Sequence, residues 1–183
     1  MPRPKAPGEV WLKQAESDLM AAERLAGGGE KLYCQTVSKC QQAVEKAVKG
    51  IASDLEARGI PLIGLPATAG SKHSALTFTE AFRRIAPSSQ NHEVKAHISG
   101  LLNERGVMSG ICDLDALVPA FPKGGALHPR NTEYPYQQNN GTWRAPAEHG
   151  SFGPQEVERF RGIAEIVVGR TSRIISAIAR RPT

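Results

Sequence analysis

The fold is decided by residues 33–55, which read YCQTVSKCQQAVEKAVKGIASDL. Apolar residues recur there every three or four positions, at Tyr33, Val37, Cys40, Val44, Ala47, Val48, Ile51 and Leu55. This spacing predicts a helix of about six turns with one apolar face. We expect the other face to be polar, with Glu45 and Lys49 paired along it because they lie four residues apart. A long helix with a single apolar face must bury that face against other helices, so the stretch predicts a helical bundle.

Further helical patterns flank this stretch. Gly27, Gly28 and Gly29 end a first helix that opens at Glu9, and Gly59 ends the long helix. The predicted helices after the first are 30–58, 72–85 with Ser71 as its cap, a region from 91 or 92 that Gly106 and Gly110 interrupt, a short piece over 112–118, and 154–180. Pro154 fits the first turn of the last helix.

These patterns predict an all-α fold, an antiparallel up-and-down bundle of about five helices. Val44 and Val167 should both point into its core. Residues 1–8 are rich in proline and should be loose, and residues 119–153 read as an irregular insert before the last helix. Asn140 and Gly141 stand between extended-looking flanks in that insert, which is a signal for a small hairpin.

The bulk composition fits one domain over residues 1–183. The chain has 23 Lys and Arg against 18 Asp and Glu, a net charge of +5 that favours an anionic partner only slightly. Its three cysteines form no CxxC pair, which suggests reduced thiols, and Cys40 reads as a small core residue. We see no signal peptide and no membrane span, so we expect a cytoplasmic protein.

Three stretches together resemble the HEPN domain family. The first is the pattern of Trp11, Ala15, Asp18, Leu19 and Ala22. The second and most specific is CQQAVEKAVK at 40–49, and the third is KHSAL at 72–76. The resemblance implies an antiparallel helical bundle that forms a homodimer. An excess of apolar residues on several helices, more than one small bundle needs, favours the same conclusion.

The candidate ligand-binding residues come from two regions. The resemblance points to Gln42, Lys46, Lys72 and His73, and the insert adds Arg130, Glu133, Tyr134 and Trp143. For Gln42 and Lys46 we favour a packing role that fixes the register of the bundle or covers a dimer seam. Aromatic residues among arginines can stack on bases and pair with phosphates, but they can equally pack on the bundle or on a second subunit. The arginines of the last helix are a further possible phosphate-binding face, or simply a solvated one.

The catalytic candidates rest on weaker patterns. Many relatives carry Arg-Tyr-Pro before the final helix, whereas this chain has Glu133, Tyr134 and Pro135 there, with Arg130 nearby. Ribonuclease members use an Arg and a His four to six residues apart on a helix. Here only Arg144 and His149 have that spacing, with Pro146 between them, so we interpret the match as coincidental. No metal-ligand spacing and no cofactor motif is present, and we expect neither.

The leading hypothesis from the resemblance is a HEPN-type protein that is non-catalytic or catalytically altered. It would bind a nucleotide or nucleic acid, or pair with a nucleotidyltransferase-type partner in a toxin–antitoxin or defence module. One alternative is a metal-independent endoribonuclease that acts as a dimer, with Arg144 and His149, or Arg130 and a histidine, as acid and base. Another alternative is a scaffold that binds only protein.

Overall fold

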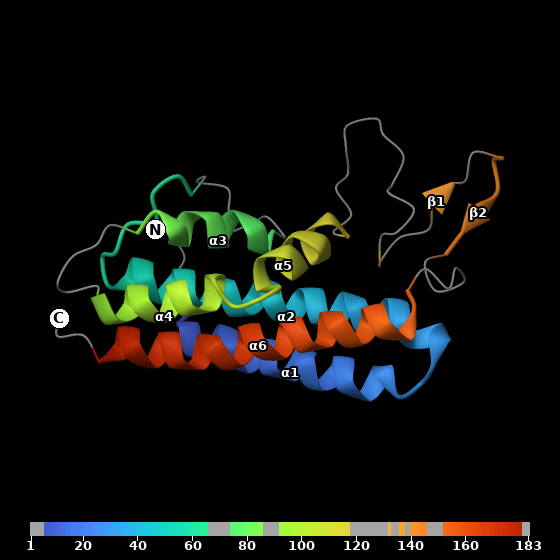
Figure 1. Cartoon of the computed structure of the whole chain (residues 1–183), viewed down its shortest axis with the longest axis horizontal. Helices are drawn as coiled ribbons and strands as arrows, with labels where there is room; N and C mark the ends of the chain where they lie inside the picture. Colours follow the sequence, from blue (N-terminus) through green and yellow to red (C-terminus); the bar gives the residue numbers. More distant parts are fainter. Residues whose placement is uncertain are drawn as a thin grey trace.

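The computed structural model describes residues 6–65, 74–85, 92–117, 132, 136–137, 140–145 and 152–180. These residues form six helices and one two-stranded hairpin, so the predicted helical bundle is confirmed (Figure 1). The expected loose segment 1–8 lies partly outside the described residues, and helix α1 already begins at Gly8.

Helices α1 (Gly8–Ala26) and α2 (Glu30–Ala57) pack antiparallel along most of their length, joined by the predicted glycine turn (Figure 1). The N-terminus of α1 is tied to the end of α2, because Gly8 N donates to Asp54 Oδ1 at 2.6 Å. Gly59 has a φ of +68° and donates to Glu56 O, which ends α2 where the sequence predicted. Helices α1 and α2 are therefore joined at both ends, by the glycine turn at one end and by the hydrogen bond from Gly8 to Asp54 at the other.

Helix α6 (Pro154–Ala179) completes the three long helices and begins at Pro154 as expected. It packs on α2 and α1, and it runs antiparallel to α1 and in the same direction as α2 (Figure 1). Arg58, just after α2, donates to Ala179 O at the end of α6, so the ends of the two helices are joined. The long chain segment between α2 and α6 is what allows two neighbouring helices to share a direction.

Three short helices complete the bundle: α3 (Ala75–Arg83) packs on α2, α4 (His92–Leu102) packs mainly on α6, and α5 (Val107–Ala116) packs on both. The expected start of α3 was wrong. Ser74, not Ser71, is its cap, because the Ser74 Oγ accepts from Thr77 N at 3.3 Å. The expected piece at 112–118 was also wrong. Helix α5 begins at Val107, and Gly110 lies inside it. An added Cβ at Gly110 would meet Ile163 at 2.6 Å, so this glycine lets α5 pack closely on α6.

The predicted hairpin is present. Strands β1 (Tyr136–Gln137) and β2 (Trp143–Arg144) pair antiparallel, and Gly141 between them has a φ of +83°. Thr142 donates from both its backbone N and its hydroxyl to Asn140 Oδ1. The hairpin stands beyond the end of the bundle near the start of α6 (Figure 1).

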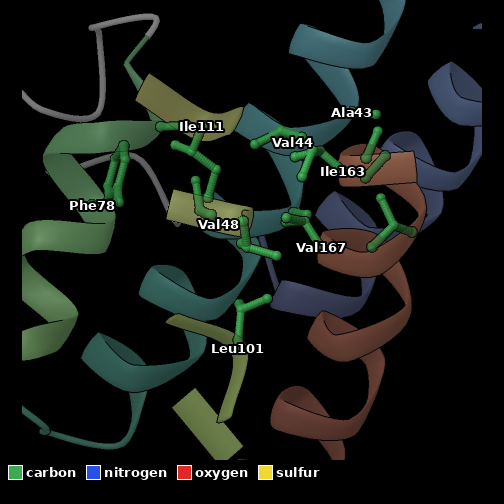
Figure 2. Packing of buried hydrophobic residues seen from close by; sticks show 14 of the residues in the cluster. Ala43, Val44, Val48, Phe78, Leu101, Ile111, Ile163 and Val167 are labelled. Atoms are coloured by element: carbon green, nitrogen blue, oxygen red, sulfur yellow. The ribbon is translucent and has the colours of Figure 1, made fainter. Parts of the chain in front are cut away.

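The core lies where α2 meets the other helices. Val44 of α2 and Val167 of α6 are both buried, as predicted, and Ile111, Phe78 and Leu101 approach from the short helices (Figure 2). Cys40 is fully buried, which confirms its role as a core residue, and burial raises the pKa of its thiol to about 12. Within the described ranges, no helix is long and apolar enough to cross a membrane.

Candidate functional site

A buried carboxylate lies between α1 and α2. Asp18 of α1 is almost fully buried and accepts from two lysines of α2, Lys39 at 3.0 Å and Lys46 at closer range. Lys39 also donates to Gln42 Oε1 at 2.9 Å. Lys39 and Lys46 lie about two turns apart on the same side of α2, so one carboxylate of α1 binds both ammonium groups. This fixes the register of α1 against α2.

A second charged pair lies further along α2. Lys49 donates to Glu45 Oε1 at 2.6 Å, and both side chains are buried. The Lys49 ammonium lies 5.8 Å from the centre of the Trp11 ring, a favourable position over an aromatic face. The expectation that Glu45 and Lys49 lie on a polar face was therefore wrong. They are at the edge of the apolar face, where neighbouring helices pack over them.

Asp115 at the end of α5 meets the beginning of α3. Its carboxylate accepts from Ser74 Oγ at 2.8 Å and lies 3.4 Å from Leu76 N, so it completes the cap of α3. Burial raises the pKa of Asp115, the hydrogen bonds from Ser74, Leu76 and Ala75 lower it less, and the charge of Glu45 raises it further. Glu45 and Asp115, from two different helices, thus belong to one electrostatic environment.

The candidates from the sequence separate into two groups. Gln42 and Lys46 belong to the Asp18 network, in half-buried positions. Trp143 lies in β2 and is 67% exposed, so it does not pack on the bundle. The remaining ligand-binding candidates lie outside the described residues: Lys72, His73, Arg130, Glu133 and Tyr134.

Of the catalytic candidates, only Arg144 is described. It lies in the two-residue strand β2, whereas the ribonucleases of the resembled family carry their arginine on a helix. His149 and Arg130 lie outside the described residues. In the part of the chain with described positions, no three His, Cys, Asp or Glu residues are grouped as a metal site.

The arginines of α6, together with Arg180 just after its end, are mostly paired with carboxylates. Arg159 pairs with Asp113, Arg170 with Glu104 at 2.6 Å, and Arg180 with Glu93 at 2.6 Å. Arg161 bridges Glu158 and Glu165 on its own helix. Arg173 is the exception, because no carboxylate among the described residues pairs with it. The arginine face is thus largely neutralised within the molecule.

Sequence reasoning missed the roles of Asp18 and Asp115. A signal for Asp18 was available, because it is three residues after Ala15 and four before Ala22, both of which lie on the buried face of α1. A charge at that spacing must be buried with a partner. No comparable local signal marks Asp115, because its partners are on α3.

Comparison with known families bears on this pair of helices. Residues 9–61 match the family model of the HEPN domain. The match confirms the resemblance and spans α1, α2 and the first residues after them, including Asp18, Lys46 and Glu45. That the remaining helices belong to the same HEPN domain stays a prediction. Neither the curated proteins nor the solved structures gave a significant match.

Proposed function

We propose that this HEPN-type protein is a binding module without ribonuclease activity. It acts as a homodimer in the cytoplasm, and it takes a nucleotide or nucleic acid as ligand or pairs with a nucleotidyltransferase-type partner in a toxin–antitoxin or defence module. One observation carries the non-catalytic part. The buried charged residues of the HEPN match are engaged with neighbouring charges, Asp18 of α1 with two lysines of α2 and Glu45 with Lys49 within α2.

The position of Arg144 supports the same proposal. An acid–base pair for cleavage at the 2′-hydroxyl needs two side chains held rigidly at one phosphate. The ribonucleases of the resembled family carry this pair on a helix, but Arg144 is in strand β2 of the hairpin. Its spacing to His149 therefore lacks the helical context that gives the motif its meaning.

The ligand class is supported by the exposed aromatic residue on the hairpin. Trp143 presents its ring to solvent next to Thr142, Gly141 and Asn140, which are exposed and uncharged. Every nucleobase can stack on such a ring, and stacking contributes about 1–3 kcal/mol per base. The nucleotidyltransferase-type partner rests on the family resemblance alone.

The test is an RNA cleavage assay with a binding assay on the same purified protein. In EDTA, a mixed-sequence RNA should stay intact after long incubation, and Arg144→Ala and His149→Ala should behave like the wild type. Titration with single-stranded RNA or nucleotide should quench tryptophan emission, and Trp143→Phe should reduce that quenching. Cleavage in EDTA that both variants abolish would establish the endoribonuclease instead. An intact dimer with no response to either ligand would favour the protein-only scaffold.

The partner is tested by co-expression. If a small nucleotidyltransferase is encoded beside this chain, the two proteins should co-purify in a fixed ratio through size exclusion. Separate elution of the two proteins at micromolar concentration would remove this part of the proposal.

A further inference from the structure

One side of α6 carries a row of arginines that runs along most of the helix and includes its C-cap residue. At about 100° per residue, these arginines fall within an arc of about 80° around the helix axis. The row is about 30 Å long, because each residue advances a helix by about 1.5 Å. We call this row the arginine stripe, and its members are Arg159, Arg170, Arg173 and Arg180. Arg161 lies on the other side of the helix and does not belong to it.

Three carboxylates cover the arginine stripe, and all three belong to the segment from α4 to α5. They pair with the first, second and last arginines of the stripe. Their order along the chain is reversed, and they are spaced nine and eleven residues apart where those arginines are eleven and ten residues apart. The carboxylates therefore match the spacing of the arginines. We call them the carboxylate row, and its members, in order along α6, are Asp113, Glu104 and Glu93.

These three ion pairs contribute little to holding α4 and α5 in place. Every side chain in them is between 37% and 63% exposed, and solvent screens ion pairs of this kind. The two helices are anchored by buried apolar residues instead, among them Ile98 and Leu101 in α4 and Ile111 and Leu114 in α5. The main effect of the carboxylate row is therefore to neutralise the arginine stripe.

Arg173 lacks such a carboxylate within the described part of the chain. It is exposed, and together with Arg170 and Glu104 it lines a depression of about 300 Å³. The other acidic residue of this depression, Glu165, is paired with Arg161. A phosphate that enters the depression would therefore meet the charge of Arg173 first and would then compete with Glu104 for Arg170.

The arginine stripe begins at the end of α6 that lies near the hairpin with Trp143. The hairpin stands beyond the bundle near the start of α6, and Arg159 is in the second turn of that helix (Figure 1). A nucleic acid whose base stacks on Trp143 could extend its backbone from there along α6. A single nucleotide could occupy only a small part of a row about 30 Å long, so the length of the stripe favours a polynucleotide.

We propose that the arginine stripe is a binding surface for the phosphate backbone of a polynucleotide, and that the carboxylate row covers it in the isolated chain. The inference rests on the nucleic-acid ligand of the proposed function, and it assigns to that ligand a second surface and a means of regulation. The carboxylates occupy the positions that phosphates would take, so the arginines become available as the carboxylates are neutralised or displaced.

The test neutralises the carboxylate row and leaves the arginines in place. The triple variant Glu93→Gln/Glu104→Gln/Asp113→Asn should bind a labelled single-stranded RNA about tenfold or more tightly than the wild type at about 50 mM salt. The slope of log affinity against log salt should steepen by about 2, because each phosphate contact of a single strand adds about 0.7. Fluorescence anisotropy measures both quantities, and circular dichroism checks that the variant is folded. If the triple variant does not fold, Glu104→Gln alone should steepen the slope by about 0.7.

Controls separate the arginine stripe from net charge. Glu16→Gln/Glu23→Gln/Glu80→Gln changes the net charge equally at exposed positions of α1 and α3, and it should leave the slope almost unchanged. Adding Arg170→Gln and Arg173→Gln to the triple variant should remove most of its gain. A nucleoside monophosphate should bind the wild type and the triple variant equally, because it is too short to use the stripe.

Two outcomes would overturn the inference. A triple variant that gains no more than the charge-matched control would remove the arginine stripe, and ligand quenching of tryptophan in the wild type would still support the proposed function. Equal gains for RNA and for the monophosphate would remove the polynucleotide as its occupant. If the wild type shows no response to RNA or nucleotide and the triple variant binds RNA with the steeper slope, the covered stripe is supported and the ligand of the proposed function fails for the isolated chain.

Discussion

Asp18 is the residue on which the packing of α1 against α2 depends most. It is buried, and its carboxylate is the common acceptor for Lys39 and Lys46. Asp18→Ala leaves two ammonium groups without their acceptor, and we expect a loss of about 1–3 kcal/mol in the free energy of unfolding, below the cost for a fully buried pair because both lysines reach solvent. Urea denaturation measures this, with exposed Glu16→Ala on the same helix as control. Equal midpoints for the two variants would contradict the assigned role.

Asp115 should make stability depend on pH. Its pKa is raised in the folded protein, chiefly by burial. The ionised form is therefore disfavoured by folding, and the stability that the protonated carboxyl contributes is present below its unfolded pKa and lost as pH rises through its folded pKa. The side chain of Asp115→Asn stays neutral, so the unfolding free energy of the variant should rise relative to that of the wild type as pH rises from about 4 to about 7. The measurement is the difference in unfolding free energy across this range, with exposed Glu80→Gln on α3 as control. If the variant instead loses stability relative to the wild type as pH rises, the pKa of Asp115 is not raised by folding.

The three cysteines should differ sharply in reactivity. Cys112 is exposed, while Cys34 and Cys40 are buried and the pKa of the Cys40 thiol is raised to about 12. Because the thiolate is the reactive form, a disulfide reagent at mild alkaline pH should modify Cys112 quickly in the folded protein and all three cysteines after unfolding in urea. Cys112→Ser should abolish the fast phase. Rapid modification of a second thiol would mean that the α2 core opens readily.

At the scale of the helix, the two glycines of α5 and α4 have opposite roles. An added Cβ at Gly110 would meet Ile163 of α6 at 2.6 Å, whereas at Gly100 of α4 it would meet nothing. Gly110→Ala should therefore cost about 1–3 kcal/mol through overpacking. Gly100→Ala should gain about 0.5–1 kcal/mol through helix propensity. Thermal denaturation of the pair checks both signs, and stabilisation by both variants would show that α5 does not rest on α6 at this point.

The helices differ in how well the local sequence predicts them. Helices α1, α2 and α6 follow from apolar spacing because each buries one long face, and their ends follow from Gly59, Pro154 and the glycine turn. Gly110 misled the prediction because a helix-breaking glycine and a packing glycine are identical in sequence. Only contact with Ile163 distinguishes the two, and that contact is between residues 53 positions apart.

The candidate site was predictable to a smaller degree for the same reason. Gln42 and Lys46 could be named from the resemblance, but the carboxylate that joins their network is Asp18 of another helix. It accepts from Lys46 and from Lys39, and Lys39 also donates to Gln42. Glu45 and Lys49 were assigned to a polar face by periodicity, yet Trp11 of α1 lies against Lys49. Helical spacing states which residues share a side, and it does not state how far a neighbouring helix extends over the edge.

At the scale of the whole molecule, the net charge of +5 is a poor guide to how this protein would hold a polyanion. Three of the four arginines of α6 are already paired with carboxylates of the same chain, and so is Arg180 just after the helix. A phosphate that contacts one of these paired arginines would have to compete with its carboxylate, so few counterions would be released if RNA binds along α6. We therefore expect few phosphate contacts and a shallow dependence of affinity on salt.

For single-stranded RNA, affinity should fall less than about tenfold between about 50 and about 200 mM salt, which corresponds to about two phosphate contacts. Trp143→Phe should weaken binding at every salt concentration without changing this slope, because stacking releases no counterions. Fluorescence anisotropy with a labelled oligonucleotide measures both quantities, and Arg24→Gln serves as the control for loss of an exposed charge away from the hairpin. A fall of a hundredfold or more would require many phosphate contacts, and the intramolecular pairs of α6 would then have to open on binding.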